Sequence, residues 1–145
     1  MFKEALDAIT LHFQQALTEH TSDISSHPGR FTEQELSRLL TAKKAVRIAI
    51  ENTQSISVNG QGIREARLLV AAYIICSDSK KNPRHQSALD MTEAVIRELP
   101  FNRFGTNALL PVEPKTISAE NLYSGEIDRK GIALWGISWE QTLRG

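Results

Sequence analysis

The sequence predicts one α+β domain, residues 1–145, in which a mostly antiparallel mixed sheet of about four strands packs with helices on one face. Three observations predict this class: a helical apolar period near the N-terminus, an uncharged β-rich segment in the middle, and an alternating segment at the end. The expected order is helix, helix, strand, strand, helix, strand, strand, which is typical of α+β proteins. A chain of 145 residues has the usual length of one domain.

The first third of the chain predicts two helices separated by a loop. Apolar residues recur every third or fourth position in the first helix: Phe2, Leu6, Ile9, Phe13 and Leu17. Residues 21–30 (TSDISSHPGR) contain Ser, Pro and Gly and predict a loop. A capping-box pair, Thr32 and Glu35, then starts a short second helix that carries Leu36, Leu39 and Leu40.

Two strands are expected next. Val46, Ile48 and Ile50 alternate with more polar residues, as in a strand with one buried face. The following stretch through Gly60 and Gly62 is expected to be a flexible connection. Residues 68–76 (LLVAAYIIC) carry no charge, which favours a strand covered on both faces at the centre of the sheet.

The remaining chain predicts a helix and a hairpin. Asn82 and Pro83 suit a helix start, and the apolar stripe that follows ends at Pro100. Residues 101–114 are expected to be a loop and residues 115–122 a strand. A turn through residues 124–131 then leads into the final strand, so these two strands should pair as a hairpin with a long tip.

Composition excludes several function classes. The 17 basic and 17 acidic residues cancel, so no overall field attracts nucleic acid or an anionic membrane. A lone Cys76 excludes an intramolecular disulfide and suits a reducing compartment. No stretch approaches the roughly 20 apolar residues of a membrane span, so we expect an intracellular protein without a membrane partner.

No pattern in the sequence predicts catalysis. The histidines lack metal-ligand spacing, and His12 is expected to occupy a solvated helix position. Cys76 and His85 could form a nucleophile and base if the chain folded back, but a core cysteine is favoured. We therefore expect no enzyme, and no catalytic, cofactor-binding or metal-binding residues.

Lys80, Lys81 and Arg84 lie with His85 around the start of the third helix. Cations near a helix N-terminus can hold a phosphate, which makes these residues a candidate anion or partner patch. The alternative is a solvated tip whose lysines discourage unwanted strand pairing, and it is the favoured interpretation.

The final strand places both tryptophans on one face. Ala133, Trp135, Ile137, Trp139 and Leu143 alternate with smaller or polar residues. Trp135 is expected to cover the core against the first helix. Trp139 lies nearer the end of the chain and is expected at a subunit boundary, where tryptophan is enriched.

The chain resembles a known family in two segments, RLLVAAYIIC and the terminal GIALWGISWEQTLRG, and in the order of its elements. The chain is similar to the tail-terminator family of Mu-like contractile-tailed phages and prophages, long catalogued as a domain of unknown function. The specific matches lie in the last twenty-five residues or so: Asn121, Leu122, Tyr123, Trp139, Glu140, Gln141 and Thr142.

The resemblance implies a structural protein that joins a ring, expected to be a hexamer, at the head-proximal end of the tail tube and halts tube growth. Its partners would be copies of itself, the tail tube, and the sheath or head–tail connector proteins. It would reside in the host cytoplasm during assembly and then in the virion tail. The candidate interface residues are Trp139, Glu140, Gln141 and Tyr123.

Three alternatives stay open. A nucleic-acid-binding module would use Lys80, Lys81 and Arg84, with Lys43 and Lys44 nearby. The chain could instead be another small connector of the head–tail joint. An enzyme that uses Cys76 is the third.

Overall fold

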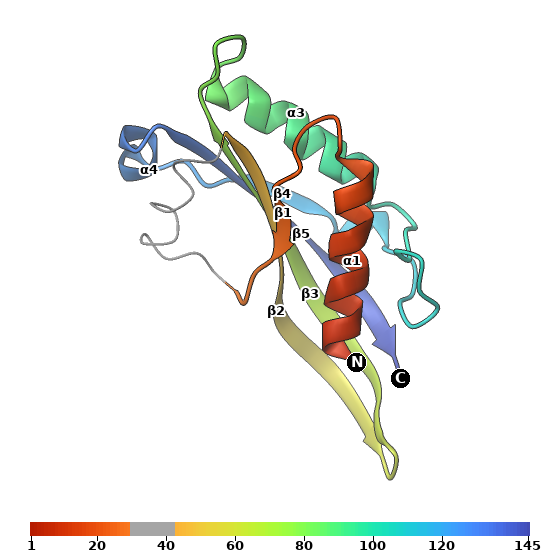
Figure 1. Cartoon of the computed structure of the whole chain (residues 1–145). Coiled ribbons are helices and arrows are strands. Elements are labelled where there is room, and N and C mark those ends of the chain that lie inside the picture. The colour runs from red at the N-terminus through yellow and green to blue at the C-terminus, as the bar shows by residue number, and fades with distance from the viewer. Residues whose placement is uncertain (30–42) are drawn as a thin grey trace.

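A five-stranded mixed sheet forms the centre of the protein in the computed structural model, which describes residues 1–29 and 43–145 (Figure 1). The strands are β1 (Ile24–Ser26), β2 (Lys44–Asn59), β3 (Gly62–Ser77), β4 (Ser118–Asn121) and β5 (Ile132–Arg144). Their order across the sheet is β1-β2-β3-β5-β4. The β1–β2 pair is parallel and the other pairs are antiparallel. The predicted α+β class and mostly antiparallel sheet are confirmed, with five strands in place of about four.

Among the described residues, two long helices cover one face of this sheet (Figure 1). They are α1 (Phe2–Ala16) and α3 (Arg84–Arg97). A 3-10 turn, η1 (Pro114–Thr116), precedes β4, and a short helix, α4 (Gly125–Arg129), lies between β4 and β5. The helix predicted around Thr32–Leu40 lies outside the described residues.

The main core lies between α1, α3 and the sheet. Even-numbered β3 residues from Ala66 to Cys76 face it, as do the odd-numbered β5 residues. Phe13 and Ile9 of α1 are fully buried against them. Burying a side chain of this size stabilises the fold by about 1.5–3 kcal/mol, so the apolar stripe of α1 is what holds the helix on the sheet.

A smaller apolar cluster covers the opposite surface of the sheet. It contains Ala45, Ile75, Ile132 and Leu134, with Tyr73, Leu122 and Ile127 packed beside them. We call this surface the outer face. Because β3 is buried on both sides, its position at the centre of the sheet confirms the prediction made from its uncharged run.

The predicted loop at residues 21–30 contains a strand. Ile24 of β1 pairs with Val46 and is buried, and the His27 N–H donates to the Ile48 carbonyl at 2.8 Å. A single apolar residue among serines gives no alternation, so tertiary pairing decides this element.

The prediction of a flexible connection around Gly60 and Gly62 is wrong. The β2 and β3 strands continue to Asn59 and Gly62, which face each other across a tight turn. Pairing of β3 with β5 begins only at Glu65, so residues 54–64 project as a two-stranded ribbon beyond the ends of α1 and β5 (Figure 1). We call this ribbon the arm. Its residues are exposed except for a half-buried Ile63, so burial alternation could not reveal it.

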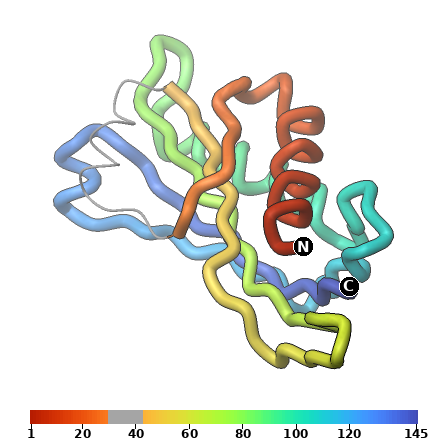
Figure 2. The backbone as a smooth tube through the Cα atoms, turned by 60° about the horizontal axis from the view of Figure 1, so that its bottom comes forward, coloured from red at the N-terminus to blue at the C-terminus, as the bar shows by residue number. Residues whose placement is uncertain are grey.

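The β4–β5 hairpin confirms the predicted pairing but differs at its tip. The predicted turn through residues 124–131 contains α4, whose first turn is capped by Ser124 Oγ accepting from the Ile127 N–H at 3.1 Å. Figure 2 shows this tip projecting from one side of the molecule. The β5 strand pairs with β3 without a register break, from Ile132 opposite Ser77 to Arg144 opposite Glu65.

Candidate functional site

The final strand holds the residues that the sequence singled out most strongly. Trp139 is fully buried, and its ring centroid lies 6.3 Å from that of Phe13 and 6.1 Å from that of Phe104. These distances are typical of packed aromatic pairs. Trp139 therefore joins β5 to α1 and to the loop after α3. Trp135, expected in that place, is only half-buried at the margin of the main core.

Gln141 lies beside Trp139 and is buried as well. Its Oε1 accepts from the indole N–H of Trp139 at 3.1 Å, and its amide donates to the carbonyls of Asn102 at 3.1 Å and Leu110 at 2.8 Å. One side chain thus satisfies three polar groups and ties the 101–113 loop to the sheet.

Trp139 and Gln141, both predicted at an interface, therefore do not reach the surface of the chain. Both side chains are buried within the chain itself and have no surface to offer to a neighbour. Glu140 points to the outer face, where it pairs with Arg67 at 2.6 Å and accepts from Gln54 at 3.3 Å. Tyr123 is 59% exposed. Of the four candidates, only Glu140 and Tyr123 are accessible from outside.

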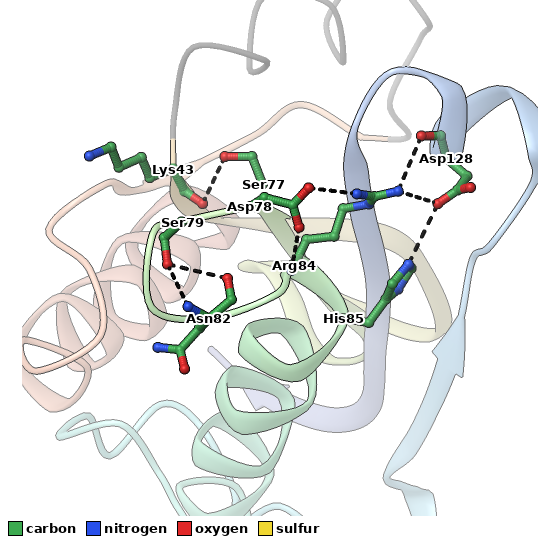
Figure 3. Close-up of polar contacts among 8 residues, drawn as sticks. All are labelled: Lys43, Ser77, Asp78, Ser79, Asn82, Arg84, His85 and Asp128. Carbon is green, nitrogen blue, oxygen red and sulfur yellow. Dashed lines mark hydrogen bonds and ion pairs between the residues drawn. The ribbon is translucent and has the colours of Figure 1, made fainter.

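The predicted basic patch is an ion-pair cluster around the start of α3 (Figure 3). The Arg84 guanidinium donates to Asp78 at 2.7 Å and to Asp128 of α4 at 2.6 Å. The Arg84 N–H also donates to Asp78, at 2.8 Å, which satisfies a free N–H in the first turn of the helix. His85 lies 3.5 Å from Asp128. This cluster fastens α4 to the start of α3.

Arg84 is already neutralised by these carboxylates. The pKa of Asp78 is lowered, first by the hydrogen bond from the Arg84 backbone N–H. The pKa of Asp128 is lowered, first by the hydrogen bond from the Arg84 side chain, and the same bond raises the pKa of Arg84. Arg84, a member of the candidate anion or partner patch, is therefore already paired with two carboxylates.

Lys80 and Lys81 lie in the turn that leads to this cluster, and both are exposed. The turn is closed locally by Ser79, whose Oγ accepts from the Asn82 N–H at 3.1 Å (Figure 3). Neither lysine has an ion-pair partner among the described residues. What remains of the predicted patch is two lysines on a solvated tip, the interpretation that the sequence favoured.

Cys76 and His85 contact different partners. The Cys76 Sγ is buried in the main core, 3.5 Å from the Met91 Sδ, and burial raises the pKa of the thiol to about 11. His85 is exposed near Asp128 and Tyr123. A thiol with this pKa stays protonated at neutral pH and is a poor nucleophile.

His12 is not at the solvated position that was expected. It is half-buried, with Nε2 3.0 Å from Glu98 Oε1 and 3.1 Å from the Asn102 amide nitrogen. Its ring meets the edges of Phe13 and Phe104. His12 therefore joins α1 to the end of α3 and to the loop that follows.

A cleft of about 480 Å³ lies on the outer face between β2 and β4. Small residues of the central strands, such as Ala71 and Gly136, leave this space open, while Leu122 and Leu134 line its apolar part. Two carboxylates, Glu51 and Glu120, and the hydroxyls of Tyr73, Ser118 and Ser138 line it as well. The Tyr73 hydroxyl donates to Glu51. Such a cleft suits a group with an apolar body and a polar or cationic end.

Sequence reasoning did not find this cleft, and no local signal could have revealed it. Glu51, Tyr73 and Glu120 lie on three different strands. In the sequence, none of them differs from an ordinary strand residue. Glu51 also lies at a register shift between Ile50 and Asn52, which re-aims its side chain.

Two further features of the described residues bear on the site. In residues 1–29 and 43–145, no group of three or more His, Cys, Asp or Glu side chains is arranged to hold a metal ion. The helices of the same residues include none that is long and apolar enough to cross a membrane.

Comparison with known proteins bears on the fold and not on the function. No protein family matches the chain, and no curated protein matches it. Among the matching solved structures is one whose name describes no function. It is 16% identical, has a TM-score of 0.53, and the match covers 96% of this chain and 95% of the other. This similarity extends over the whole domain.

Proposed function

We propose that this protein is a structural subunit of a phage or prophage tail, a tail terminator that forms a ring at the head-proximal end of the tail tube and halts its polymerisation. The proposal begins from the resemblance of the C-terminal segment to the Mu-like tail-terminator family, at Asn121–Tyr123 and Trp139–Thr142. Its partners are copies of itself, expected to number six, together with the tube and the sheath or head–tail connector proteins.

One structural observation carries the proposal: in the part of the chain that the structure describes, the sheet is open at two dissimilar margins. The β4 margin is a single strand of four exposed residues. The opposite margin is β2, which among residues 1–29 and 43–145 is covered by β1 only over Val46–Ile48. A ring requires a head-to-tail contact in which one patch of a subunit meets a different patch of the next. Two unlike open margins on one sheet supply such a pair of patches.

In the proposed ring, the buried part of the matched segment would act within each subunit. Trp139 and Gln141 fix the 101–113 loop to the sheet and do not face a partner. Their role in a ring would be to hold the subunit rigid. Partner contacts then fall to exposed residues such as Tyr123.

The test is association with tubes. The purified chain is analysed by native mass spectrometry alone and after mixing with tail tubes, and tube ends are inspected by electron microscopy. We expect a closed ring, alone or on the tube end, and tubes that no longer elongate when tube subunits are added. A chain that stays monomeric and leaves tube ends bare and growing would exclude the terminator function.

A nucleic-acid-binding module is the second candidate. It rests on the exposed Lys80 and Lys81. The pairing of Arg84 with two carboxylates and the net charge of zero both weaken it, since duplex binding depends on several free cations. Another connector of the head–tail joint would share the ring but would not stop tube growth.

A further inference from the structure

The arm, residues 54–64, is an unusual exposed edge. From residue 52 to residue 63 the chain reads NTQSISVNGQGI and contains no charged side chain. Two apolar side chains on it are exposed, Ile56 at 48% and Val58 at 67%. Proteins normally protect exposed strand edges with charges, especially lysine, or with proline. Residues 54–63 of the arm have neither, and its one charge, Arg64, lies at its base, so the rest of the arm is suited to strand pairing with another chain.

An isolated two-stranded ribbon is only marginally stable in water. The arm has no neighbouring strand on either side among the described residues, because β1 ends opposite Ile48 and β5 ends opposite Glu65. Register shifts between Gln54 and Val58 interrupt its own pairing further. A third strand added to its edge would stabilise it.

The β4 strand is a suitable third strand. All of its residues, Ser118–Asn121, are exposed, and its outer edge has no partner strand among the described residues. The β2 edge of the arm from Ser57 to Asn59 is three residues long, with one register shift between Ser57 and Val58.

Charge is also compatible with this pairing. Glu120 on β4 would meet an uncharged strand, so no like charges are opposed. Arg64, exposed at the base of the arm, and Glu120 both lack ion-pair partners among the described residues. The two margins therefore carry unpaired charges of opposite sign, which favours contact between them.

We infer that the arm pairs with β4 of a second copy of this chain, so that the sheets of neighbouring copies join edge to edge. The inference rests on the proposed ring and names its contact. Because the arm and β4 belong to opposite margins of the sheet, each copy uses its arm on one neighbour and offers β4 to the other. Backbone hydrogen bonds between strands give the contact its affinity, and Ile56 and Val58 add buried apolar area.

Cysteine cross-linking tests the contact directly. One preparation carries Val58→Cys and another carries Ala119→Cys, and the native Cys76 remains because its thiol is buried. Mixed at tens of micromolar, with and without tail tubes, and oxidised, the two should form a disulfide-linked heterodimer well above either preparation alone. Leu89→Cys, on an exposed position of α3, is the control and should not cross-link to Val58→Cys. Absence of the Val58–Ala119 cross-link in assembled protein overturns the inference.

A charge on the arm provides the second test. Val58→Lys changes a side chain that is 67% exposed, so the subunit itself should keep its circular dichroism spectrum and its urea midpoint. We expect assembly to weaken at least about tenfold, because the added charge must be desolvated at the new strand pair. Leu89→Lys should assemble as the wild type does. A ring that forms equally well with Val58→Lys overturns the inference.

The outcomes separate this inference from the proposed function. Tube ends capped by a ring that ignores the arm substitutions support the terminator function and overturn the arm contact. Arm–β4 cross-links in a protein that never binds tubes support the contact and contradict the terminator function. A chain that stays monomeric under all conditions, with no cross-links, contradicts both.

Discussion

The indole N–H of Trp139 donates to the side-chain oxygen of Gln141 at 3.1 Å, two residues along the same strand, and both side chains are buried. The most distinctive part of the sequence therefore makes contacts inside the chain. The loop after α3, which carries no helix or strand before η1, is held to the sheet through this pair.

Replacement of Gln141 by Leu should destabilise the protein by about 2–3 kcal/mol, because the Trp139 N–H and the carbonyls of Asn102 and Leu110 lose their partner. The free energy of unfolding in urea measures the effect. Gln86→Leu, on an exposed position of α3, is the control and should stay within about 0.5 kcal/mol of the wild type. Equal stabilities of the two variants would contradict this account of Gln141.

Asp128→Asn should lower the urea midpoint at pH 7 and have little effect in acid. The folded-state pKa of Asp128 is lowered by Arg84, so its carboxylate stabilises the protein above the unfolded pKa of about 3.9. That contribution is lost as the pH falls through the lower folded-state pKa. The difference in urea midpoint between the variant and the wild type should therefore narrow below about pH 4. Urea titrations between pH 2 and 7 measure it.

Asp90→Asn is the matched control for Asp128. Asp90 is exposed on α3 and has no ion-pair partner among the described residues, so its replacement should leave the urea midpoint nearly unchanged at every pH. If the difference in urea midpoint between Asp128→Asn and the wild type stays constant down to pH 2, the ion pair with Arg84 is not the cause of that difference.

Cys76 should resist thiol reagents in the folded protein. Its thiol is buried and its pKa is raised to about 11, so little thiolate is present at pH 7.5. Absorbance assays with a chromogenic disulfide should show labelling only as the chain unfolds in urea. The exposed Val58→Cys variant should gain one rapidly labelled thiol under the same conditions. Rapid labelling of the native Cys76 would reopen a chemical role for this residue.

Lys80→Glu combined with Lys81→Glu should leave assembly unchanged, since both lysines occupy a solvated turn. The wild type should show no salt-dependent binding to duplex DNA by fluorescence anisotropy at tens of micromolar protein. Binding that weakens steeply with salt and disappears in the double variant would instead favour the nucleic-acid alternative.

Much of the fold could be predicted because its core follows simple periods. The stripe of α1, the uncharged run of β3 and the alternation of β5 each repeat over several turns or residue pairs, so burial leaves a clear pattern. Elements without such a pattern were missed. The β1 strand has one buried residue, Ile24, and the arm has no fully buried one.

The candidate site was predicted less well, for a different reason. A tryptophan on a strand face has the same signature whether its partner is another subunit or the same chain. Only the fold shows that Phe13 and Phe104 enclose Trp139. Likewise, one of the two carboxylates that pair with Arg84, Asp128, lies far along the sequence on α4, and only the fold brings it to Arg84.

The unbroken pairing of β5 with β3 has a consequence for how this chain tolerates length changes. Inserting one residue between Ile132 and Trp135 would turn over every later side chain, so that Glu140 would enter the core and Trp139 would face water. Two inserted residues would return each side chain to its original face of the sheet but would pair each β5 residue with a different residue of β3. Viable insertions and deletions should therefore concentrate in turns such as Gly60–Gln61 and be absent from the final strand.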